Sequence, residues 1–418
     1  RSLLGQYLVK NGLRVTAVAE GRAMWQALEA GRIDLIGVPS EAGGRNGTSG
    51  GSAALKLAFF SMLAQTGLYH TYRLVHGHME HPELFVLGGV PRGKVHYKKH
   101  IAGIADLTAR HVCASLMDDG LTVVVGGDHS VAIGSGRGAL EFARCTGKRV
   151  GLLWVDAHYD AHTDKTSPSH NANGMPLASL LGHGVREFRP SRVDDESGKR
   201  LPCPKFLPEH VLHLGAGKTN CEPEEKALLE RLGVRAFSAE ELRRSFLPAR
   251  LALLGLLSRV DLIVVSLDLD AVDRAFAPGV HLQSDGGLSQ TMLFAIAHLV
   301  ALSGKLCHVD IVEHKPSAEE YDESGRAKTA SLAAEFLLRL LEKYVTPDQL
   351  VRGILFRATR FLFALAFFLG EGVESTCDPL HQLSTLFLGD DERRSDTDHP
   401  MRVFRQESGV EECSKHLA

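Results

Sequence analysis

The sequence predicts an α/β protein whose sheet is mostly parallel and carries helices on its faces. Short apolar runs typical of buried strands alternate along the chain with longer segments in which apolar residues recur at helical spacing. Three of these runs lead directly into carboxylate and imidazole side chains. Because ligands collect at the carboxyl edge of an open α/β sheet, this second pattern also predicts where the functional site lies.

The predicted elements follow one another along most of the chain. An apolar run at 34–39 is the first strand, and a glycine-rich loop at 43–51 leads from it into a helix that begins at Ser52. In the last predicted helix, at 328–343, apolar residues recur at helical spacing and should face the sheet. Further strands are predicted at 121–125, 150–155, 211–215, 234–237, 262–267 and 307–312, and helices at 102–117, 224–232, 288–302 and 328–343.

The glycine-rich loop at 43–51 has two readings. Its backbone could cradle an anion, but it lacks both the dinucleotide-binding fingerprint and the P-loop lysine. We therefore interpret it as a flexible rim of a pocket.

Composition bounds the domain organisation and the partners. The chain has 418 residues, and its net charge of −3 gives no field that would recruit nucleic acid or an acidic membrane. We expect an N-terminal extension at 1–33, a catalytic domain at 34–345, an apolar helical extension at 346–388 and a disordered polar tail at 389–418. The apolar stretch at 354–369 contains Arg357 and Arg360, which favour a packed or interfacial helix over a membrane span.

Cysteine usage indicates a reducing compartment. The seven cysteines are scattered, odd in number and include no Cys-x-x-Cys pair. This pattern argues against a disulfide framework and against a zinc-thiolate site. No signal peptide is visible at the start of the sequence, so we expect a cytoplasmic protein.

The residues that follow the three buried strands predict a metal centre. Carboxylates and imidazoles without a thiolate favour a hard or borderline divalent cation, and manganese fits this composition best. A site this rich in carboxylates is typical of two cations that share bridging ligands and activate a water between them. The candidate ligands are His129, Asp156, His158, Asp160, Asp268 and Asp270.

Each motif alone also has an ordinary structural explanation. A lone Gly-Gly-Asp-His is usually a turn, and a lone Asp-x-Asp is usually a helix cap or a solvated loop. Three buried strands that all end in such residues are poorly explained in this way, because unpaired carboxylates would be costly to desolvate there. If the segment 156–160 stays extended, its alternate side chains also share one face.

At this point the motifs carry a family resemblance. GGDHS at 126–130, WVDAHYDAHT at 154–163 and SLDLDAVD at 266–273 resemble the three motifs of the arginase/ureohydrolase family. The resemblance covers residues 34–343 and implies a three-layer αβα fold, two Mn²⁺ ions per subunit and hydrolysis of a guanidino or amidino carbon–nitrogen bond. It also implies a homo-oligomer, a trimer or hexamer. By the match of motifs all six ligands are intact, and Asp160 would bridge the metals and pass a proton to the leaving nitrogen.

The same resemblance suggests substrate contacts. DIVE at 310–313 is similar to the family's strand that ends in a glutamate, so Glu313 would hold the substrate's guanidinium. SPSHNANGMP at 167–176 resembles the loop with which arginases bind the α-carboxylate of the amino acid. Ser169 and Asn171 match the serine and asparagine of that loop.

Two departures from the arginase pattern concern substrate and proton handling. Asn173 stands where arginases have a proton-shuttle histidine, so we hypothesise that His162 or His170 takes over that step. Asn220 or Lys218 stands where arginases use an aspartate for the substrate's α-amino group.

Other segments are similar to formimidoylglutamases: Arg45-Asn-Gly, APGV at 277–280 and VEHKP at 312–316. The leading hypothesis is an arginase acting on L-arginine, with formimidoylglutamase or an agmatinase-like enzyme as alternatives. A metal-binding pseudoenzyme is the alternative from another class.

Overall fold

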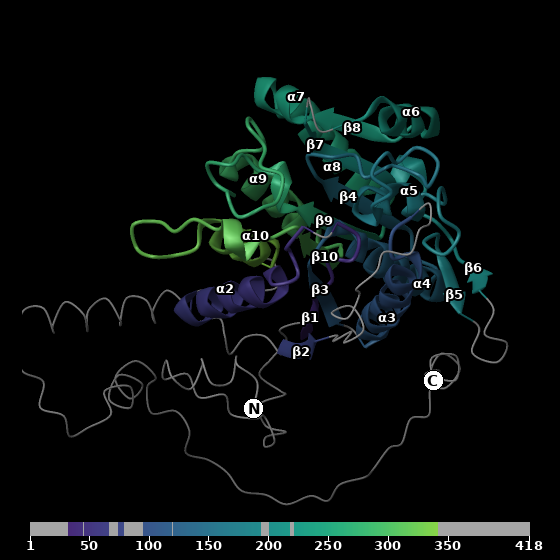
Figure 1. Cartoon of the computed structure of the whole chain (residues 1–418), viewed down its shortest axis with the longest axis horizontal. Helices are drawn as coiled ribbons and strands as arrows, with labels where there is room; N and C mark the ends of the chain where they lie inside the picture. The colour runs from purple at the N-terminus through teal and green to yellow at the C-terminus, as the bar shows by residue number, and fades with distance from the viewer. Residues whose placement is uncertain are drawn as a thin grey trace, which may run out of the picture. The chain divides into compact units, whose positions relative to one another are not determined.

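An eight-stranded parallel sheet organises the protein, with the strand order β2-β1-β3-β10-β9-β4-β7-β8 (Figure 1). The computed structural model describes residues 32–44, 46–66, 74–78, 95–118, 120–193, 200–217 and 221–341. The predicted α/β fold class is confirmed. The strands are β1 (Arg32–Val38), β2 (Leu74–His78), β3 (Gly120–Gly126), β4 (Val150–Val155), β7 (Val211–Ala216), β8 (Arg235–Ser238), β9 (Leu262–Asp268) and β10 (Leu306–Val312).

Helices cover both faces of the sheet and complete three layers. Alternate strand residues point to opposite sides: Leu153 and Val155 of β4 pack into one buried cluster, whereas Leu152 and Trp154 pack into another. The first cluster includes residues of α2 (Gly51–Thr66), α7 (Ala239–Arg244), α8 (Leu247–Arg259), α9 (Gln290–Ser303) and α10 (Lys328–Leu341). The second includes residues of α3 (Lys98–Met117), α4 (Ala132–Thr146), α5 (Pro176–Leu180) and α6 (Pro223–Leu232).

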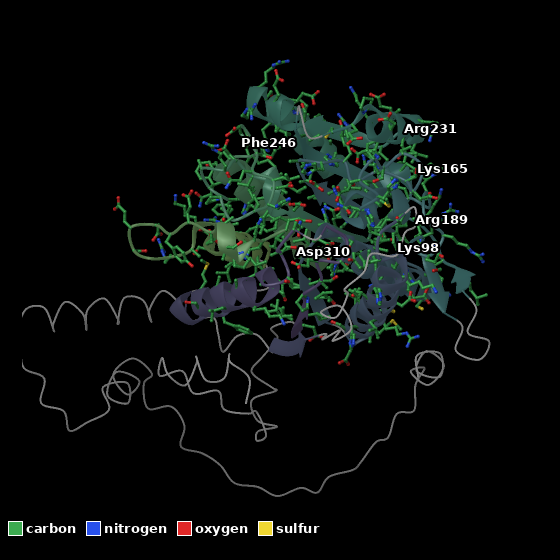
Figure 2. All side chains as sticks on the ribbon, in the orientation of Figure 1. Lys98, Lys165, Arg189, Arg231, Phe246 and Asp310 are labelled. Carbon is green, nitrogen blue, oxygen red and sulfur yellow. The ribbon has the colours of Figure 1, made fainter. Side chains whose placement is uncertain are left out.

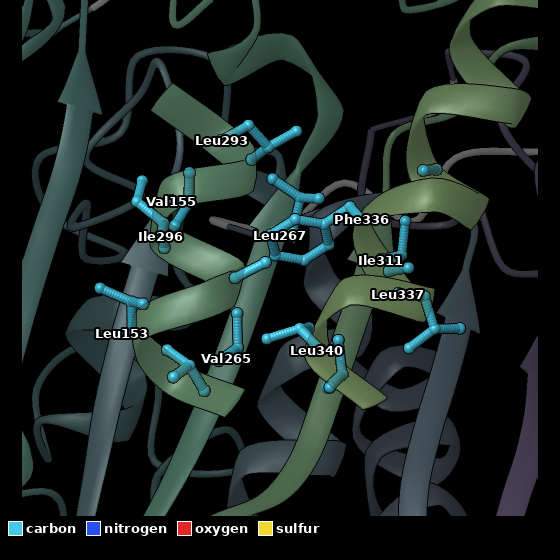
Figure 3. Close-up of a cluster of buried hydrophobic side chains, with 14 of the residues drawn as sticks. Leu153, Val155, Val265, Leu267, Leu293, Ile296, Ile311, Phe336, Leu337 and Leu340 are labelled. Carbon is cyan, nitrogen blue, oxygen red and sulfur yellow. The ribbon is translucent and has the colours of Figure 1, made fainter. Parts of the chain in front are cut away.

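Figure 3 shows how the first face is filled between β4, β9, β10 and the helices α9 and α10. Phe336 of α10 is fully buried and lies beside Leu267 of β9, while Leu293 and Ile296 of α9 cover the neighbouring strand. Apolar burial of this kind contributes about 1.5–3 kcal/mol for each large side chain. The helical spacing expected for 328–343 therefore matches the face that α10 turns to the sheet.

Four α-helices of the described residues were not predicted from the sequence: the short α5 and α7, and the longer α4 and α8. Three glycines in α4 lower its helix propensity, but α4 packs so closely on α3 that larger residues would not fit. A Cβ on Gly134 would lie 2.8 Å from the Cα of Ala105, and one on Gly138 would lie 2.6 Å from the carbonyl oxygen of Ala109. Close packing of two helices has prevailed over local propensity here.

Most charged side chains of the described residues lie at the surface, and several carboxylates are buried near the strands. Lys165, Arg189 and Arg231 are exposed at the periphery, and Asp310 lies among the strands (Figure 2). The Asp310 carboxylate accepts a hydrogen bond from Oγ of Ser135 at 2.8 Å and lies 2.9 Å from Nε2 of His308. These contacts satisfy a polar cluster on the α4 side of β10.

Glu319 ties the start of α10 to the loop that follows β10. Its carboxylate accepts hydrogen bonds from the backbone N–H groups of Thr329 (2.9 Å) and Ala330 (3.1 Å) and from Nε2 of His314 (2.8 Å). Burial opposes ionisation, but the hydrogen bonds from His314 and Thr329 outweigh it and hold the pKa of Glu319 below its usual value.

We expect Glu319→Gln to destabilise the protein by about 2 kcal/mol at pH 7, because a buried carboxylate with three donors is replaced by a neutral amide. Since the pKa of this acid is lowered by folding, its stabilisation is present above the unfolded pKa and is lost as pH falls through the folded pKa. The difference from wild type should therefore shrink below about pH 4 in urea unfolding. Glu320→Gln, which removes an exposed ion pair with Lys328, is the control and should cost less than about 0.5 kcal/mol. An equal loss in both variants would contradict the expectation.

The topology brings the predicted motifs to one edge of the sheet. β3, β10, β9 and β4 are consecutive in space although they are far apart in sequence, so their carboxyl ends lie side by side. β10 is inserted between β3 and β9, at the kind of switch point where α/β sheets bind ligands.

The expected domain boundaries stay predictions. β1 begins at Arg32, two residues before the predicted start of the domain. The segments 346–388 and 389–418 lie outside the described residues. Among the residues that the structure describes, no helix is long and apolar enough to cross a membrane.

Candidate metal centre

His129 lies at the centre of a buried group of carboxylates. It starts a 3₁₀ turn (His129–Val131) directly after β3, and its Nδ1 is 3.1 Å from Oδ2 of Asp156, 3.0 Å from Oδ2 of Asp160 and 3.1 Å from Oδ2 of Asp268. One imidazole nitrogen can donate to only one of these three oxygens. Nδ1 is buried and forms no well-directed hydrogen bond. A cation bound between the imidazole and the carboxylates would satisfy all of them.

A second group overlaps the first. Nδ1 of His158 lies 3.0 Å from Oδ2 of Asp270 and 3.6 Å from Oδ1 of Asp156. The donor atoms of His129, Asp156 and Asp160, and likewise those of Asp156, His158 and Asp270, all lie within 4.8 Å of one another. Asp156 belongs to both groups, with one oxygen facing each histidine. This arrangement fits two divalent cations that share a carboxylate.

The donor set converges through turns and not through extended chain, so the expectation of an extended 156–160 segment is wrong. β4 ends at Val155, the chain bends at Ala157 and His158, and Asp160 has a φ of 49° in the left-handed region. After β9, Asp268 accepts a hydrogen bond from the backbone N–H of Asp270 at 2.9 Å, which forms a tight turn. Turns of this kind bring alternate carboxylates to one place without a strand.

Two residues that the sequence analysis did not single out support the ligands. The indole Nε1 of Trp154 donates to Oδ2 of Asp156 at 2.9 Å, and its ring stacks on His129 with centroids 4.2 Å apart. Nε2 of His129 lies 3.0 Å from Oγ of Ser266. A histidine that binds a metal through one nitrogen usually donates from the other, and Ser266 is placed to accept. Their position two residues before an aspartate, on the same face of the strand, was the available signal.

Burial and mutual repulsion control the protonation of the carboxylates. Burial, followed by the charge of Asp156, raises the pKa of Asp160 to about 7. Burial and the neighbouring charge of Asp270 also raise the pKa of Asp268 well above its usual value. For Asp156, burial would raise the pKa, but the nearby imidazoles of His129 and His158 outweigh it and lower the pKa. The site thus concentrates negative charge that a divalent cation would neutralise.

The two ligand histidines respond in the opposite direction. Burial alone would lower the pKa of His129, but its contacts with Asp156, Asp160 and Asp268 raise that pKa well above the usual value. The pKa of His158 is likewise raised, because the Asp270 and Asp156 carboxylates outweigh burial. Each imidazole must lose its extra proton to bind a metal.

Glu313 lies next to these ligands, directly after β10. Its Oε1 accepts a hydrogen bond from the backbone N–H of His129 at 2.9 Å, and its backbone has a φ of 64°. Burial, followed by the charge of Asp128, raises the pKa of Glu313 well above its usual value. A buried carboxylate of this kind is a strong partner for a planar cation that reaches it.

The start of the glycine-rich loop, at Gly43 and Gly44, forms an anion cradle inside the protein, and the interpretation of the whole loop as a flexible rim stays a prediction. The backbone N–H groups of Gly43 and Gly44 both donate to Oδ2 of Asp128, at 2.7 and 2.8 Å. Oδ1 of Asp128 accepts from the backbone N–H and the hydroxyl of Ser130. The anion is therefore the protein's own carboxylate, and a Cβ on Gly43 would come within 2.7 Å of it.

The predicted substrate loop is well ordered by its own contacts. Oγ of Ser169 accepts from the backbone N–H of Asn171 at 3.3 Å, and Oγ of Ser167 accepts from the backbone N–H of His170 at 3.0 Å. Ser169 is exposed and Asn171 is half-buried, so both can contact a ligand. The side chain of Asn173 approaches Gly44 of the anion cradle, since its Cγ is 3.3 Å from where a Cβ on Gly44 would lie.

The two candidate substitutes for the proton shuttle have different surroundings. Nε2 of His162 lies 3.3 Å from Glu222 and 3.6 Å from Glu225, and its Nδ1 lies 3.2 Å from Oγ1 of Thr166. His170 has a φ of 55°, and its carbonyl oxygen accepts from the backbone N–H of His96. Asn220 and Lys218 lie outside the described residues, so the amino-group contact stays a prediction.

Comparison with known proteins agrees with this geometry. The sequence matches the Arginase family over residues 32–342. An arginase from Bacillus caldovelox is 30% identical over 319 residues, which cover 73% of this chain and 96% of that protein. Its solved structure gives a TM-score of 0.62 at 29% identity and covers 74% of this chain and 98% of that chain. The formimidoylglutamase of Bacillus subtilis subsp. subtilis str. 168 shares the fold alone, with a TM-score of 0.54 at 20% identity, covering 82% of this chain and 99% of that one.

The family match spans nearly the whole of the described sheet, from β1 to the end of α10. Within it, carboxylates and imidazoles from β3, β4 and β9 form two overlapping groups suited to divalent cations. This chain belongs to the arginase family, the hydrolases that act on carbon–nitrogen bonds of linear amidines.

Proposed function

We propose that the protein is a Mn²⁺-dependent arginase that converts L-arginine and water to L-ornithine and urea. The observation that carries the proposal is the pair of overlapping ligand groups that share Asp156, with Glu313 in contact with His129 beside them. Two Mn²⁺ ions held by the six ligands would lower the pKa of a shared water toward neutrality and so supply the nucleophile.

The remaining chemistry is assigned to side chains of this chain. Glu313 would bind the planar guanidinium, because a carboxylate can accept two parallel N–H bonds from it. Asp160, whose Oδ2 lies 3.0 Å from Nδ1 of His129, would take up a proton at its carboxylate and deliver it to the leaving nitrogen. Ser169 and Asn171 would bind the α-carboxylate, which agmatine lacks.

Support for L-arginine comes from the relatives and from the substrate loop. The relative from Bacillus caldovelox is named an arginase. The loop with Ser169 and Asn171 resembles the α-carboxylate loop of arginases. Asn173 would contribute an uncharged contact near this loop, and Asn220 would bind the α-amino group.

N-formimidoyl-L-glutamate is the second candidate substrate. Two of the three segments similar to formimidoylglutamases, 277–280 and 312–316, pair with each other: Val280 bridges to His314, and the backbone N–H of Lys315 donates to the carbonyl oxygen of Gly279 at 2.8 Å. The two segments are therefore connected to each other directly after Glu313. Both would lie near a substrate bound by Glu313.

A panel of amidines tests the proposal. Protein loaded with MnCl₂ is incubated with L-arginine, N-formimidoyl-L-glutamate and agmatine, and urea and formamide are measured. We expect urea from L-arginine at the highest kcat/KM. Formamide release alone would favour the second candidate, and no product from protein with bound manganese would favour a pseudoenzyme.

Affinity for Mn²⁺ should rise with pH. Because the pKa values of His129 and His158 are raised and that of Asp160 is about 7, protons compete with the cation for these groups below neutrality. For each proton displaced, the apparent dissociation constant should fall about tenfold per pH unit between about pH 6 and pH 8. Calorimetric titration with MnCl₂ in two buffers of different ionisation enthalpy counts the protons. An affinity that is constant over this range would contradict the expectation.

One of two histidines should replace the missing proton shuttle. We expect His162→Asn or His170→Asn to lower kcat by about 100-fold and to flatten one limb of the pH–rate profile, because an amide cannot titrate. His111→Asn, at an exposed position in α3, is the control. Unchanged profiles in both variants would sink the hypothesis that either residue acts in this way.

A further inference from the structure

The loop between β1 and α2 reaches Glu313 through a side-chain amide. Nδ2 of Asn46 donates to Oε2 of Glu313 at 2.5 Å, across 267 residues of sequence. Asn46 is buried. The strand partners of β10 are β3 and β9, so the contact of Asn46 with Glu313 is made by the side chain and not by strand pairing. The contact joins the anion cradle at Gly43 and Gly44 to the carboxylate that would bind the substrate.

The amide of Asn46 is held in one orientation by its neighbour. Oγ1 of Thr48 donates to Oδ1 of Asn46 at 2.7 Å, and both side chains are buried. Because an ionised carboxylate can only accept, the NH₂ group of Asn46 faces Glu313, which leaves Oδ1 to accept from the Thr48 hydroxyl. The backbone at Gly44 leaves room for this amide, since a Cβ there would lie 3.0 Å from Nδ2 of Asn46.

Each carboxylate oxygen of Glu313 accepts one hydrogen bond from the protein. An ionised carboxylate has about four lone-pair positions, two on each oxygen. The backbone N–H of His129 occupies one position on Oε1, and Nδ2 of Asn46 occupies one on Oε2. One position remains on each oxygen. Two parallel N–H groups of a planar amidinium need this arrangement, whereas a point-like ammonium does not.

We propose that Asn46 is a positioning residue for Glu313, which fixes the plane of the carboxylate and so selects a planar amidinium cation. The inference rests on the proposed function, because it assumes that Glu313 binds the substrate's guanidinium. Thr48 acts indirectly, because its hydrogen bond to Oδ1 holds the side-chain amide of Asn46 in place.

Kinetics of four variants test this role. In the Mn²⁺ enzyme, Asn46→Ala should raise KM for L-arginine by about 10- to 100-fold, with kcat changed less than about threefold, because the misplaced carboxylate weakens ground-state and transition-state binding alike. Thr48→Val should raise KM by a smaller factor than Asn46→Ala does. Thr48→Ser, which keeps the hydroxyl, should have the KM of the wild type. Ser49→Ala is the control from the same loop, since the contact of Ser49 with Glu41 uses only its backbone N–H. An unchanged KM in Asn46→Ala, or equal effects of Thr48→Val and Thr48→Ser, would overturn the inference.

A structural readout separates this inference from the proposed function. Crystal structures of wild type and Asn46→Ala, or of Thr48→Val if the first variant does not fold, would show the plane of the Glu313 carboxylate without any turnover. Rotation of that carboxylate in the variant supports the positioning role, even if the wild-type protein hydrolyses a different amidine. A carboxylate that keeps its orientation without Asn46 overturns the role, even if the protein is an arginase.

Discussion

Asp156→Asn is expected to abolish amidine hydrolysis, with a fall in kcat/KM of about 1,000-fold or more. Asp156 is the carboxylate that both ligand groups share, and it uses both oxygens. Oδ2 faces Nδ1 of His129 and accepts from Trp154, and Oδ1 accepts from the backbone N–H of His158 at 2.7 Å. An asparagine keeps the shape but removes the negative charge and presents an NH₂ group to one of the cation positions.

Metal content separates this loss from misfolding. Wild type should bind two Mn²⁺ ions and gain stability with added MnCl₂, by about 2.7 kcal/mol for each ion at a concentration 100 times its dissociation constant. The Asp156→Asn protein should lose at least one ion and most of that gain. Asp261→Asn is the matched control, because Asp261 lies just before β9 and pairs with Arg149 on the exposed surface. Two ions bound to the Asp156→Asn protein with full affinity would refute the assignment of Asp156 as the shared ligand.

Gly127→Ala should destabilise the protein by about 3 kcal/mol and remove its activity. A Cβ on Gly127 would lie 2.0 Å from the carbonyl oxygen of Ser40, which is backbone and cannot move aside as a flexible side chain could. The surrounding hydrogen bonds depend on this approach: the backbone N–H of Gly127 donates to Val38, and its carbonyl oxygen accepts from the backbone N–H of Glu313. The clash would therefore disturb both the end of β1 and the carboxylate beyond β10.

Urea unfolding measures this effect, with Gly103→Ala as the control. Gly103 lies in α3, and no atom lies within 4 Å of the position that its Cβ would occupy. Alanine there should stabilise the helix by about 0.5–1 kcal/mol. If the free energy of unfolding of Gly127→Ala lies within about 0.5 kcal/mol of the wild-type value, the loop after β1 can move to accommodate the added Cβ, and the expectation is wrong.

The sequence predicted the sheet well because buried parallel strands have a strong and local pattern. The runs at 150–155 and 262–267 coincide with β4 and β9 within one residue. α8 was missed for the opposite reason: its sequence LPARLALLGLLSR is apolar nearly all round, so no stripe distinguishes its buried face. α4 was missed because its glycines serve contacts with α3 that only the folded chain reveals.

The candidate metal ligands could be expected to lie close together because each follows a strand within a few residues. The supporting contacts could not be expected, since they join residues that the sequence keeps far apart. Asn46 meets Glu313 across 267 residues, and Gly43 meets Asp128 across 85. A pattern read in short windows cannot detect such pairs. For the glycine-rich loop we preferred a flexible rim over an anion-binding role, because nothing in the loop's own sequence reveals that Asp128 accepts hydrogen bonds from its backbone.

Asp160 and Glu313 both adopt positive φ values, 49° and 64°, where glycine would be more comfortable. Conformations of this kind cost side-chain-bearing residues about 1–3 kcal/mol each. Glycine at positions 160 and 313 would increase the stability of the folded protein, but it would remove both carboxylates. Tyr97 and His170 share this conformation, but only Asp160 and Glu313 carry the proposed chemistry. Glycine at these two positions would relieve backbone strain and would at the same time remove the proposed proton carrier and guanidinium partner.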